Sequence, residues 1–216
     1  MILEQEQKVQ ILLGVFIAAL IAGNLLGTKI ANLWIFIASV GIFMYPITFL
    51  VTDVVEDVFG KEKVKGFVIA GFISIVIVML FTVLSVLLPP AARYPSNEAF
   101  LAVFNPSIRI MIASLVAFLL AQYHDIWAFN FWKRKTKGRF LWLRNNLSTV
   151  VSQFIDTTLF MFIAFYMATP AYTIDFIFAL IVPYYLLKVF VAICDTPFVY
   201  LGVWWLKGKR PGKKYL

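Results

Sequence analysis

Six long stretches of mainly apolar residues constrain this chain more than any other feature of its sequence. A helix that crosses a bilayer needs roughly 20 mainly apolar residues. The stretches cover residues 9–27, 33–51, 66–88, 107–123, 147–168 and 177–205. The hydrocarbon core offers no water to unpaired backbone groups, so such stretches fold as helices. We therefore predict an all-α membrane protein in which residues 1–216 form one bundle of six transmembrane helices.

The composition agrees with this class of protein. Hydrophobic residues make up 62% of the chain and charged residues 14%, whereas soluble domains average about 45–50% apolar and about 25% charged. The single cysteine, Cys194, excludes an internal disulfide, and with one histidine there is no ligand set for structural zinc. We expect neither a metal nor a cofactor.

The positive charges predict the orientation in the membrane. Fifteen of the 19 Lys and Arg residues lie at the two termini or in the second and fourth loops. The opposite side carries Lys29, Arg93 and Arg109, and Lys188 lies inside the sixth stretch. By the positive-inside rule, both termini of this multi-pass protein face the cytoplasm. The net charge of +8 is thus explained by the bilayer, and we expect no nucleic-acid partner. The first stretch lacks a cleavage site of small residues and is interpreted as a retained helix.

Two connecting segments leave alternatives open. In the fourth loop, "IWAFNFW" precedes "KRKTKGR", and the segment fits either a helix lying on anionic headgroups or a plain basic loop. Pro46 predicts a kink in the second stretch. The acidic residues after it, Asp53, Glu56 and Asp57, fit a solvated turn, an ion entry point or partners of the basic loop.

Polar side chains within the apolar stretches are the candidate binding residues. Placing a carboxylate at a helix centre costs about 2.5–3.5 kcal/mol on insertion scales, so such side chains usually face the bundle interior. Gln153 and Asp156, three residues apart, share one helix face. Asp156 lies roughly 15 Å deep at a rise of about 1.5 Å per residue, and Asp195 lies at a similar depth. Lys188 shares a face with Asp195, and we predict that these four residues surround one polar cavity.

A purely structural role competes with this hypothesis. Lys188 paired with Asp156 or Asp195 could serve only to fix helix packing. Asn24, near the outer end of the first stretch, is a further polar candidate. Gln122 belongs to "AQYHDIWAF", which repeats the form of "SQFIDTTLF" at 152–160, but at the membrane boundary it also fits a solvated helix end.

No catalytic motif is present in the sequence. It lacks the H-E-x-x-H metal motif, the G-x-S-x-G nucleophile elbow and the Walker loop for ATP. Asp156 and Asp195 could form the dyad of an aspartyl intramembrane protease, but nothing around either residue supports that role. We predict that the protein is not an enzyme.

Four ordered segments resemble a known family. "MYPITFLVTDVVEDVFG", "LLAQYHDIWAFNFWK", "LWLRNNLSTVVSQFIDTTLF" and "LLKVFVAICDTPFVYL" are similar to successive motifs of the queuosine-precursor transporters, a vitamin-uptake-like membrane family. The resemblance runs from about Asn24 to Leu201.

The resemblance implies an inner-membrane importer of 7-deazaguanine bases such as preQ0 and preQ1, used for tRNA modification salvage. It also implies an architecture similar to the substrate-binding subunits of vitamin importers. A carboxylate accepts the adjacent N–H donors of such a base, and Gln or Lys donates to its carbonyl. The alternative is a binding subunit for a vitamin-like solute that works with a separate energising complex or as an oligomer.

Overall fold

The computed structural model describes residues 4–32, 37–136, 141–194 and 196–207. Within these ranges the chain is helical except for one short hairpin and the connecting turns. The elements are α1 (Gln5–Leu26), β1 (Ile30–Asn32), β2 (Ile37–Ser39), the 3-10 helix η1 (Val40–Met44), α2 (Tyr45–Phe59), α3 (Lys61–Leu87), α4 (Asn97–Lys135), α5 (Leu141–Phe165), α6 (Ile174–Cys194) and α7 (Thr196–Lys207).

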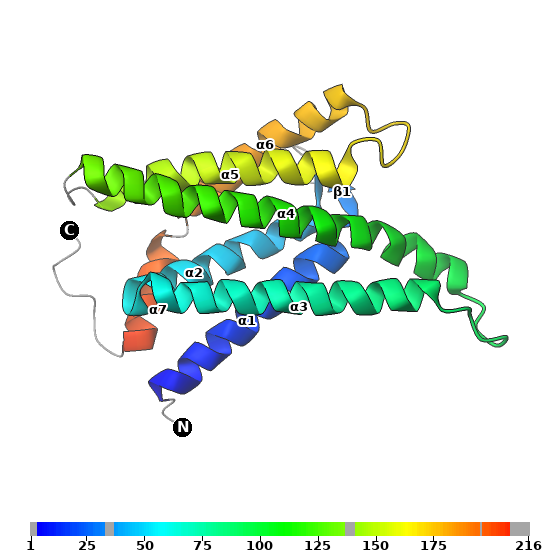
Figure 1. Ribbon diagram of the computed structural model, residues 1–216, viewed down its shortest axis with the longest axis horizontal. Helices are drawn as coiled ribbons and strands as arrows, with labels where there is room; N and C mark the ends of the chain where they lie inside the picture. The colour runs from blue at the N-terminus through cyan, green and yellow to red at the C-terminus, as the bar shows by residue number, and fades with distance from the viewer. Residues whose placement is uncertain (1–3, 33–36, 137–140, 195, 208–216) are drawn as a thin grey trace.

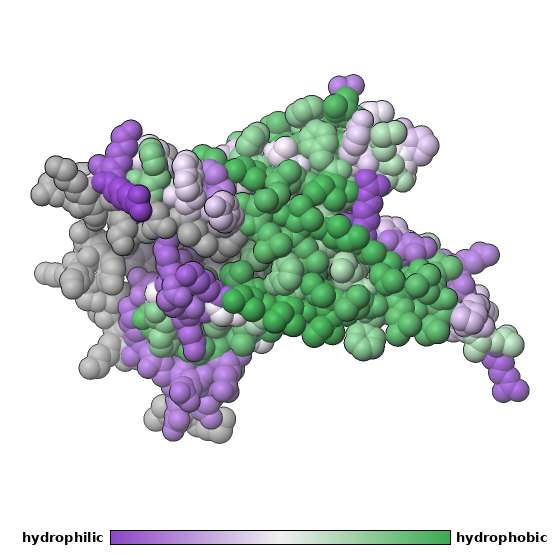
Figure 2. Space-filling view, in the orientation of Figure 1, coloured by the Kyte–Doolittle hydropathy of each residue, from purple (hydrophilic) through white to green (hydrophobic). Residues whose placement is uncertain are grey.

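The long helices form an elongated bundle (Figure 1). Helices α3, α4 and α5 run along its long axis, and α1 crosses them at an angle with α2 beside it. Figure 2 shows hydrophobic residues over the middle of this face and hydrophilic residues gathered toward its two ends. Large apolar surfaces mark contact with a membrane or another protein, so this surface agrees with the class predicted from the sequence.

Several helices are long and apolar enough to cross a membrane. Among the described residues these are Gln5–Leu26, Lys61–Leu87 and the Asn97–Ala121 part of α4, and Val150–Phe165 is a shorter apolar helix. Large side chains on them point outward, such as Phe81 at 65% exposure and Leu80 at 59%. The chain is therefore a multi-pass, mainly α-helical membrane protein.

The predicted span at 33–51 is wrong in its first part. Residues 37–39 form β2, which pairs antiparallel with β1, and the α-helix begins only at Tyr45. Pro46 therefore lies in the first turn of α2, where its missing N–H costs nothing, and it does not kink the helix. The apolar, β-branched residues of this segment suit a strand as well as a helix, which is why hydropathy did not separate the two.

Glycine permits the close contact between η1 and the end of α1. A Cβ atom on Gly41 would lie 2.6 Å from the carbonyl oxygen of Gly23 and 3.3 Å from Cα of Gly27. No side chain fits at that distance. The contact brings η1 and the start of α2 against the C-terminal half of α1.

Helix α4 is much longer than the predicted span at 107–123. It begins at Asn97, passes through Pro106 and continues to Lys135, so most of the predicted fourth loop up to that residue is helical. Trp127 stacks on Phe131, with ring centroids 5.7 Å apart, and Nζ of Lys135 lies 5.9 Å from the Phe131 ring. The segment is neither a plain loop nor a separate surface helix, because it continues α4.

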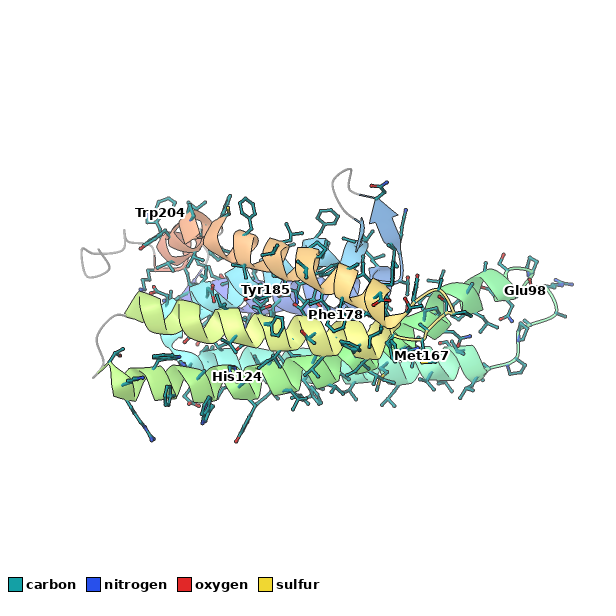
Figure 3. All side chains as sticks on the ribbon, turned by 90° about the horizontal axis from the view of Figure 1, so that it is seen from above. Glu98, His124, Met167, Phe178, Tyr185 and Trp204 are labelled. Carbon is teal, nitrogen blue, oxygen red and sulfur yellow. The ribbon has the colours of Figure 1, made fainter. Side chains whose placement is uncertain are left out.

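The predicted span at 177–205 consists of two helices. Helix α6 ends at Cys194, and α7, with Pro197 in its first turn, runs across the end of the bundle (Figures 1 and 3). Nζ of Lys8 on α1 donates to the carbonyl of Trp205 at 2.6 Å. The start of α1 and the end of α7 therefore lie at the same end of the molecule.

Helices α4, α5 and α6 enclose a buried apolar cluster. It includes Ala113 and Ala117 of α4, Met161 of α5 and Ile177 of α6, each fully buried. On the face of α5 toward α6, the hydroxyl of Tyr185 donates to the carbonyl of Val150 (Figure 3). This packing fixes the polar faces of α5 and α6 toward each other.

Arg109 of α4 caps the C-terminal end of α5. Its Nε donates to the carbonyl of Ile163 at 2.7 Å, and Nη2 donates to that of Tyr166 at 2.5 Å. The last carbonyls of a helix lack intrahelical partners, and a cation there also interacts favourably with the helix dipole.

Candidate functional site

One cavity, which we call the α1 cavity, lies between the C-terminal half of α1 and residues of β2, η1, α2, α4, α5 and α6. Its volume is about 30 Å³. Its polar lining consists of Asn24, Ser39, Tyr45, Thr48, Ser114 and Tyr184. Its apolar lining consists of Ala19, Leu20, Gly23, Gly41, Met44, Ile110 and Phe160.

A second cavity, the α6 cavity, lies beside it. Its volume is about 130 Å³, and it is lined by Ile42, Phe43, Tyr45, Pro46, Phe49, Leu187 and Lys188. Tyr45 lines both cavities, so the side chain at the start of α2 forms a wall between them.

A buried ion pair lies against that wall. Nζ of Lys188 on α6 donates to Oδ2 of Asp156 on α5 at 2.7 Å, and the two side chains are 2% and 13% exposed. The same Nζ lies 4.1 Å from the centroid of the Tyr45 ring, which is a cation–π contact. The structure therefore contains the Lys188–Asp156 pair that was the structural alternative in the sequence analysis. Lys188 of this pair lines the α6 cavity.

Asn24, which lines the α1 cavity, carries a buried acceptor without a partner in the described part of the chain. Its Nδ2 donates to the carbonyl of Leu20 at 2.8 Å, and because a carbonyl only accepts, this contact assigns the nitrogen and leaves Oδ1 on the other side. Asn24 is 6% exposed, and Oδ1 has no hydrogen-bond partner in the described part of the chain. A buried polar atom without a partner usually costs stability or serves a ligand.

Helix α5 carries further unpaired polar atoms. Among the described residues, Oε1 of Gln153 and the hydroxyls of Thr157 and Thr158 are buried without a hydrogen-bond partner. Gln153 and Thr157 are four residues apart and share a helix face. This face lies next to Asp156, so α5 has unused hydrogen-bonding capacity around the ion pair.

Gln153, Asp156, Lys188 and Asp195 were predicted to surround one cavity. The structure brings Asp156 and Lys188 into contact, and Lys188 lines the α6 cavity, while Gln153 and Asp156 line neither of the two cavities. Asn24, a separate candidate in the sequence, lines the α1 cavity. Asp195 lies outside the described residues. Gln122 lies in α4, and its side chain is outside what the structure describes.

The sequence reasoning missed the hydroxyl-bearing lining of the α1 cavity. Ser39 was assigned to a membrane helix, and Tyr45 and Tyr184 were not separated from the many other aromatic residues. The hydroxyl of Tyr184 donates to the carbonyl of Ser39 at 3.1 Å and ties α6 to β2. A tyrosine within an apolar stretch was the available signal, because a buried phenol needs a partner.

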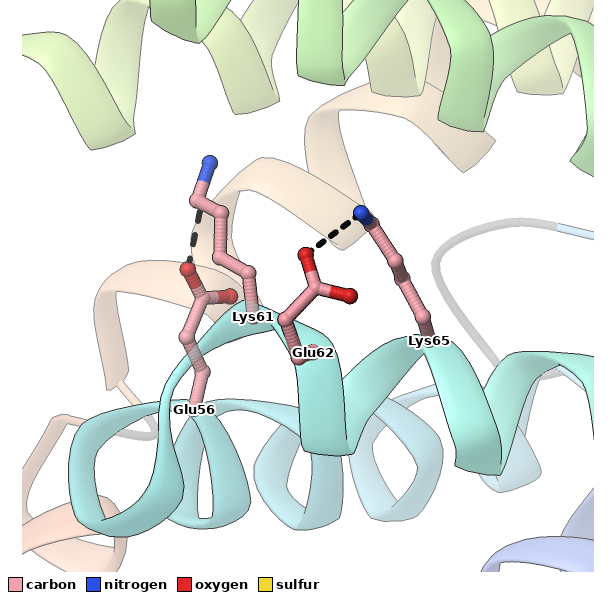
Figure 4. A network of polar contacts seen from close by, with 4 residues as sticks. All are labelled: Glu56, Lys61, Glu62 and Lys65. Atoms are coloured by element: carbon pink, nitrogen blue, oxygen red, sulfur yellow. Dashed lines mark hydrogen bonds and ion pairs between the residues drawn. The ribbon is translucent and has the colours of Figure 1, made fainter.

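The acidic residues predicted as a turn lie in the last turns of α2, which ends at Phe59, and they have cationic partners. Oε1 of Glu56 lies 4.0 Å from Nζ of Lys61, and Oε1 of Glu62 lies 2.6 Å from Nζ of Lys65 (Figure 4). Asp57 pairs with Lys207 of α7 at 3.1 Å. Described partners of Glu56 and Asp57 thus come from α3 and α7.

The described residues offer no group of three or more His, Cys, Asp or Glu side chains that could hold a metal ion. His124, the single histidine, has Nδ1 3.1 Å from the hydroxyl of Ser152, which joins α4 to α5. Figure 3 shows His124 on α4, away from the start of α6 near Phe178.

Comparisons with known proteins agree on one family. Residues 39–202 match the family described as "Putative vitamin uptake transporter". A Bacillus subtilis (strain 168) protein named "Probable queuosine precursor transporter" is 33% identical over 184 residues, covering 84% of this chain and 79% of that protein. The Escherichia coli (strain K12) "Queuosine precursor transporter" is 30% identical over 156 residues, covering 71% and 66%. No solved structure matches the chain.

Proposed function

The chain belongs to the family of queuosine precursor transporters, and on that premise we propose that it imports queuosine precursors across the inner membrane of the cell. The proposed substrates are 7-deazaguanine bases such as preQ0 and preQ1, taken up for salvage into modified tRNA. The names of the relatives support transport of this class of solute.

A buried polar cluster inside an apolar bundle is the observation that carries the proposal. The Lys188–Asp156 pair lies against Tyr45, which borders two cavities. A carboxylate accepts the adjacent N–H donors of a guanine-like edge, an ammonium donates to its carbonyl, and an aromatic ring stacks on its face. We propose Asp156, Lys188 and Gln153 as contacts of the base during transport, and Asp195 as a further contact.

The proposal includes six crossings with both termini in the cytoplasm. Several lysines lie at the end of the bundle where α1 begins and α7 ends (Figure 1): Lys8, Lys61, Lys65, Lys135 and Lys207. Basic residues concentrate on the cytoplasmic side of membrane proteins. The helices α1, α2, α3, α4, α5 and α6 then provide the crossings, and α7 lies across the cytoplasmic end.

Uptake tests the proposal directly. The gene is expressed in a strain that neither makes nor imports preQ0, and preQ1 is added to the medium. We expect labelled preQ1 to accumulate and queuosine to appear in tRNA, with an empty vector as the control. Uptake no higher than that of the vector, with the protein present in the membrane, would refute the proposed function. Purified protein in liposomes then shows whether the chain transports without another protein.

A further inference from the structure

We propose that the C-terminal end of α4 binds an anionic phospholipid, with its rings against the lipid chain and its cations on the phosphate. The site, which we call the α4 headgroup site, consists of Trp127, Phe131, Trp132, Arg134 and Lys135. It contains none of the residues proposed to contact the base, so it does not depend on the proposed function.

A stripe of large aromatic side chains lies exposed along this part of α4. Tyr123, Trp127 and Phe131 recur at every fourth residue and therefore share a helix face. They are 46% to 76% exposed, and the rings of Trp127 and Phe131 stack at an interplanar angle of 16°. Side chains of α4 near His124 point away from the other helices (Figure 3). Exposing such a face to water is unfavourable, whereas Trp and Tyr are enriched where a bilayer meets water.

The stripe has the length needed to cross the headgroup layer. It ends at Lys135, at the same end of the bundle as Lys61, where α3 begins, and Lys207, where α7 ends (Figure 1). Trp127 and Lys135 are eight residues apart, which is about 12 Å along a helix. The headgroup layer is about 5–8 Å thick on each side of the hydrocarbon core. The stripe therefore reaches from the hydrocarbon boundary, at Trp127, to the aqueous side of the phosphates, at Lys135.

The cations of this site differ from the other described lysines at the same end of the bundle. Three of those lysines each pair with a carboxylate of the chain: Lys61, Lys65 and Lys207. Arg134 and Lys135 are exposed, and neither has a carboxylate partner among the described residues. Nζ of Lys135 instead lies 5.4 Å from the centroid of the Trp132 ring, a cation–π contact that holds the ammonium beside the stripe.

A phosphate joined to an apolar chain matches this arrangement. A guanidinium binds a phosphate through two parallel N–H bonds, and the ammonium beside it adds a second charge. The helix dipole accounts for cations in the last turn of α4, but not for the exposed rings of Phe131 and Trp127 one and two turns before them. A zwitterionic lipid offers the same chain contact, but its own ammonium offsets the charge of its phosphate. We therefore expect selectivity for an anionic headgroup.

Quenching of tryptophan fluorescence by brominated lipids tests the site. The purified protein is reconstituted in vesicles of phosphatidylcholine that contain the same mole fraction of brominated phosphatidylglycerol or of brominated phosphatidylcholine. Each cation near an anionic membrane surface contributes about fivefold in affinity, so we expect the wild-type protein to prefer phosphatidylglycerol by about tenfold or more. Arg134→Gln with Lys135→Gln should reduce this preference to nearly none. Both side chains are exposed, so the double variant should still fold.

Two further variants locate the effect on α4. Lys61→Gln with Lys65→Gln is the matched control, because it removes two charges from the same end of the bundle where each lysine has a carboxylate partner. This control should keep most of the wild-type preference. Trp127→Phe keeps a ring in the stripe but removes the fluorescent reporter, so the excess quenching by phosphatidylglycerol should decrease.

Four results would overturn the inference. The first is equal quenching of the wild-type protein by the two lipids. The second is a preference that survives in the Arg134 and Lys135 double variant, and the third is a control variant that loses the preference as fully. The fourth is a Trp127→Phe variant that both lipids quench as strongly as the wild type, because Trp127 is then covered by a second copy of the chain or by another protein.

Discussion

Replacing Asp156 with Asn removes one charge of the buried pair at nearly constant shape. In the wild-type protein Oδ2 lies 2.7 Å from Nζ of Lys188, whose side chain is 2% exposed. Removing one partner of a buried pair costs about 3–5 kcal/mol, because the other charge stays uncompensated. We expect Asp156→Asn near the lower end of that range, since the amide oxygen still accepts from the ammonium, and Lys188→Met near the upper end.

The double variant separates a structural role from a role in transport. Asp156→Asn with Lys188→Met leaves no stranded charge, so stability should return to within about 1–2 kcal/mol of the wild type. Uptake of labelled preQ1 should nevertheless stay lost, because both proposed contacts with the base are gone. The assays are the thermal midpoint of the purified protein, its abundance in the membrane, and uptake.

The size of the expected shift makes the test decisive. For a chain of 150–250 residues, 1 kcal/mol moves the midpoint by about 2–4 °C, so either single variant should lose about 6–20 °C. The exposed Asp57–Lys207 pair at 3.1 Å is the control, and Asp57→Asn should cost less than about 1 kcal/mol. Normal uptake by Asp156→Asn, or uptake restored by the double variant, would show that Asp156 only neutralises Lys188.

Three further predictions concern packing and orientation. Gly41→Ala places a Cβ 2.6 Å from a backbone oxygen, so it should lower the free energy of unfolding by about 1–3 kcal/mol, measured by thermal unfolding. Gly66→Ala is the control, because its Cβ meets nothing within 4 Å, and it should be neutral or stabilising. Arg109→Lys keeps the charge but loses the two-pronged contact with the end of α5, and we expect a loss of about 1.5–3 kcal/mol; an unchanged midpoint would contradict the capping role. A reporter fused at Leu216 should give a cytoplasmic signal, and a signal from the outside would overturn the proposed orientation.

Hydropathy identified the apolar segments but not where the helices begin, end or break. An apolar window ends where polar residues begin, but a helix continues through them as long as its backbone bonds are made. This is why α4 extends to Asn97 on one side and to Lys135 on the other. The hairpin at Ile30–Ser39 was missed for the opposite reason, because its apolar residues look like the start of a span.

The polar residues of the candidate site were identifiable, but their grouping was not. Asp156, Lys188 and Asn24 stand out because charged and amide groups are rare within apolar helices. Which of them share a cavity depends on how α1 and α6 approach α2, and one sequence contains no signal for that. Tyr45 connects the two cavities, yet in the sequence it is one of nine tyrosines.

The length of α4 sets a condition on how the protein sits in a bilayer. Its 39 residues span about 58 Å at a rise of about 1.5 Å per residue, against about 40–45 Å for a whole bilayer with its headgroups. The helix must therefore tilt by roughly 40°, at the upper limit observed for membrane helices, or extend into the aqueous phase. Because α5 packs along it, a tilt of α4 would tilt α5 and Asp156 with it.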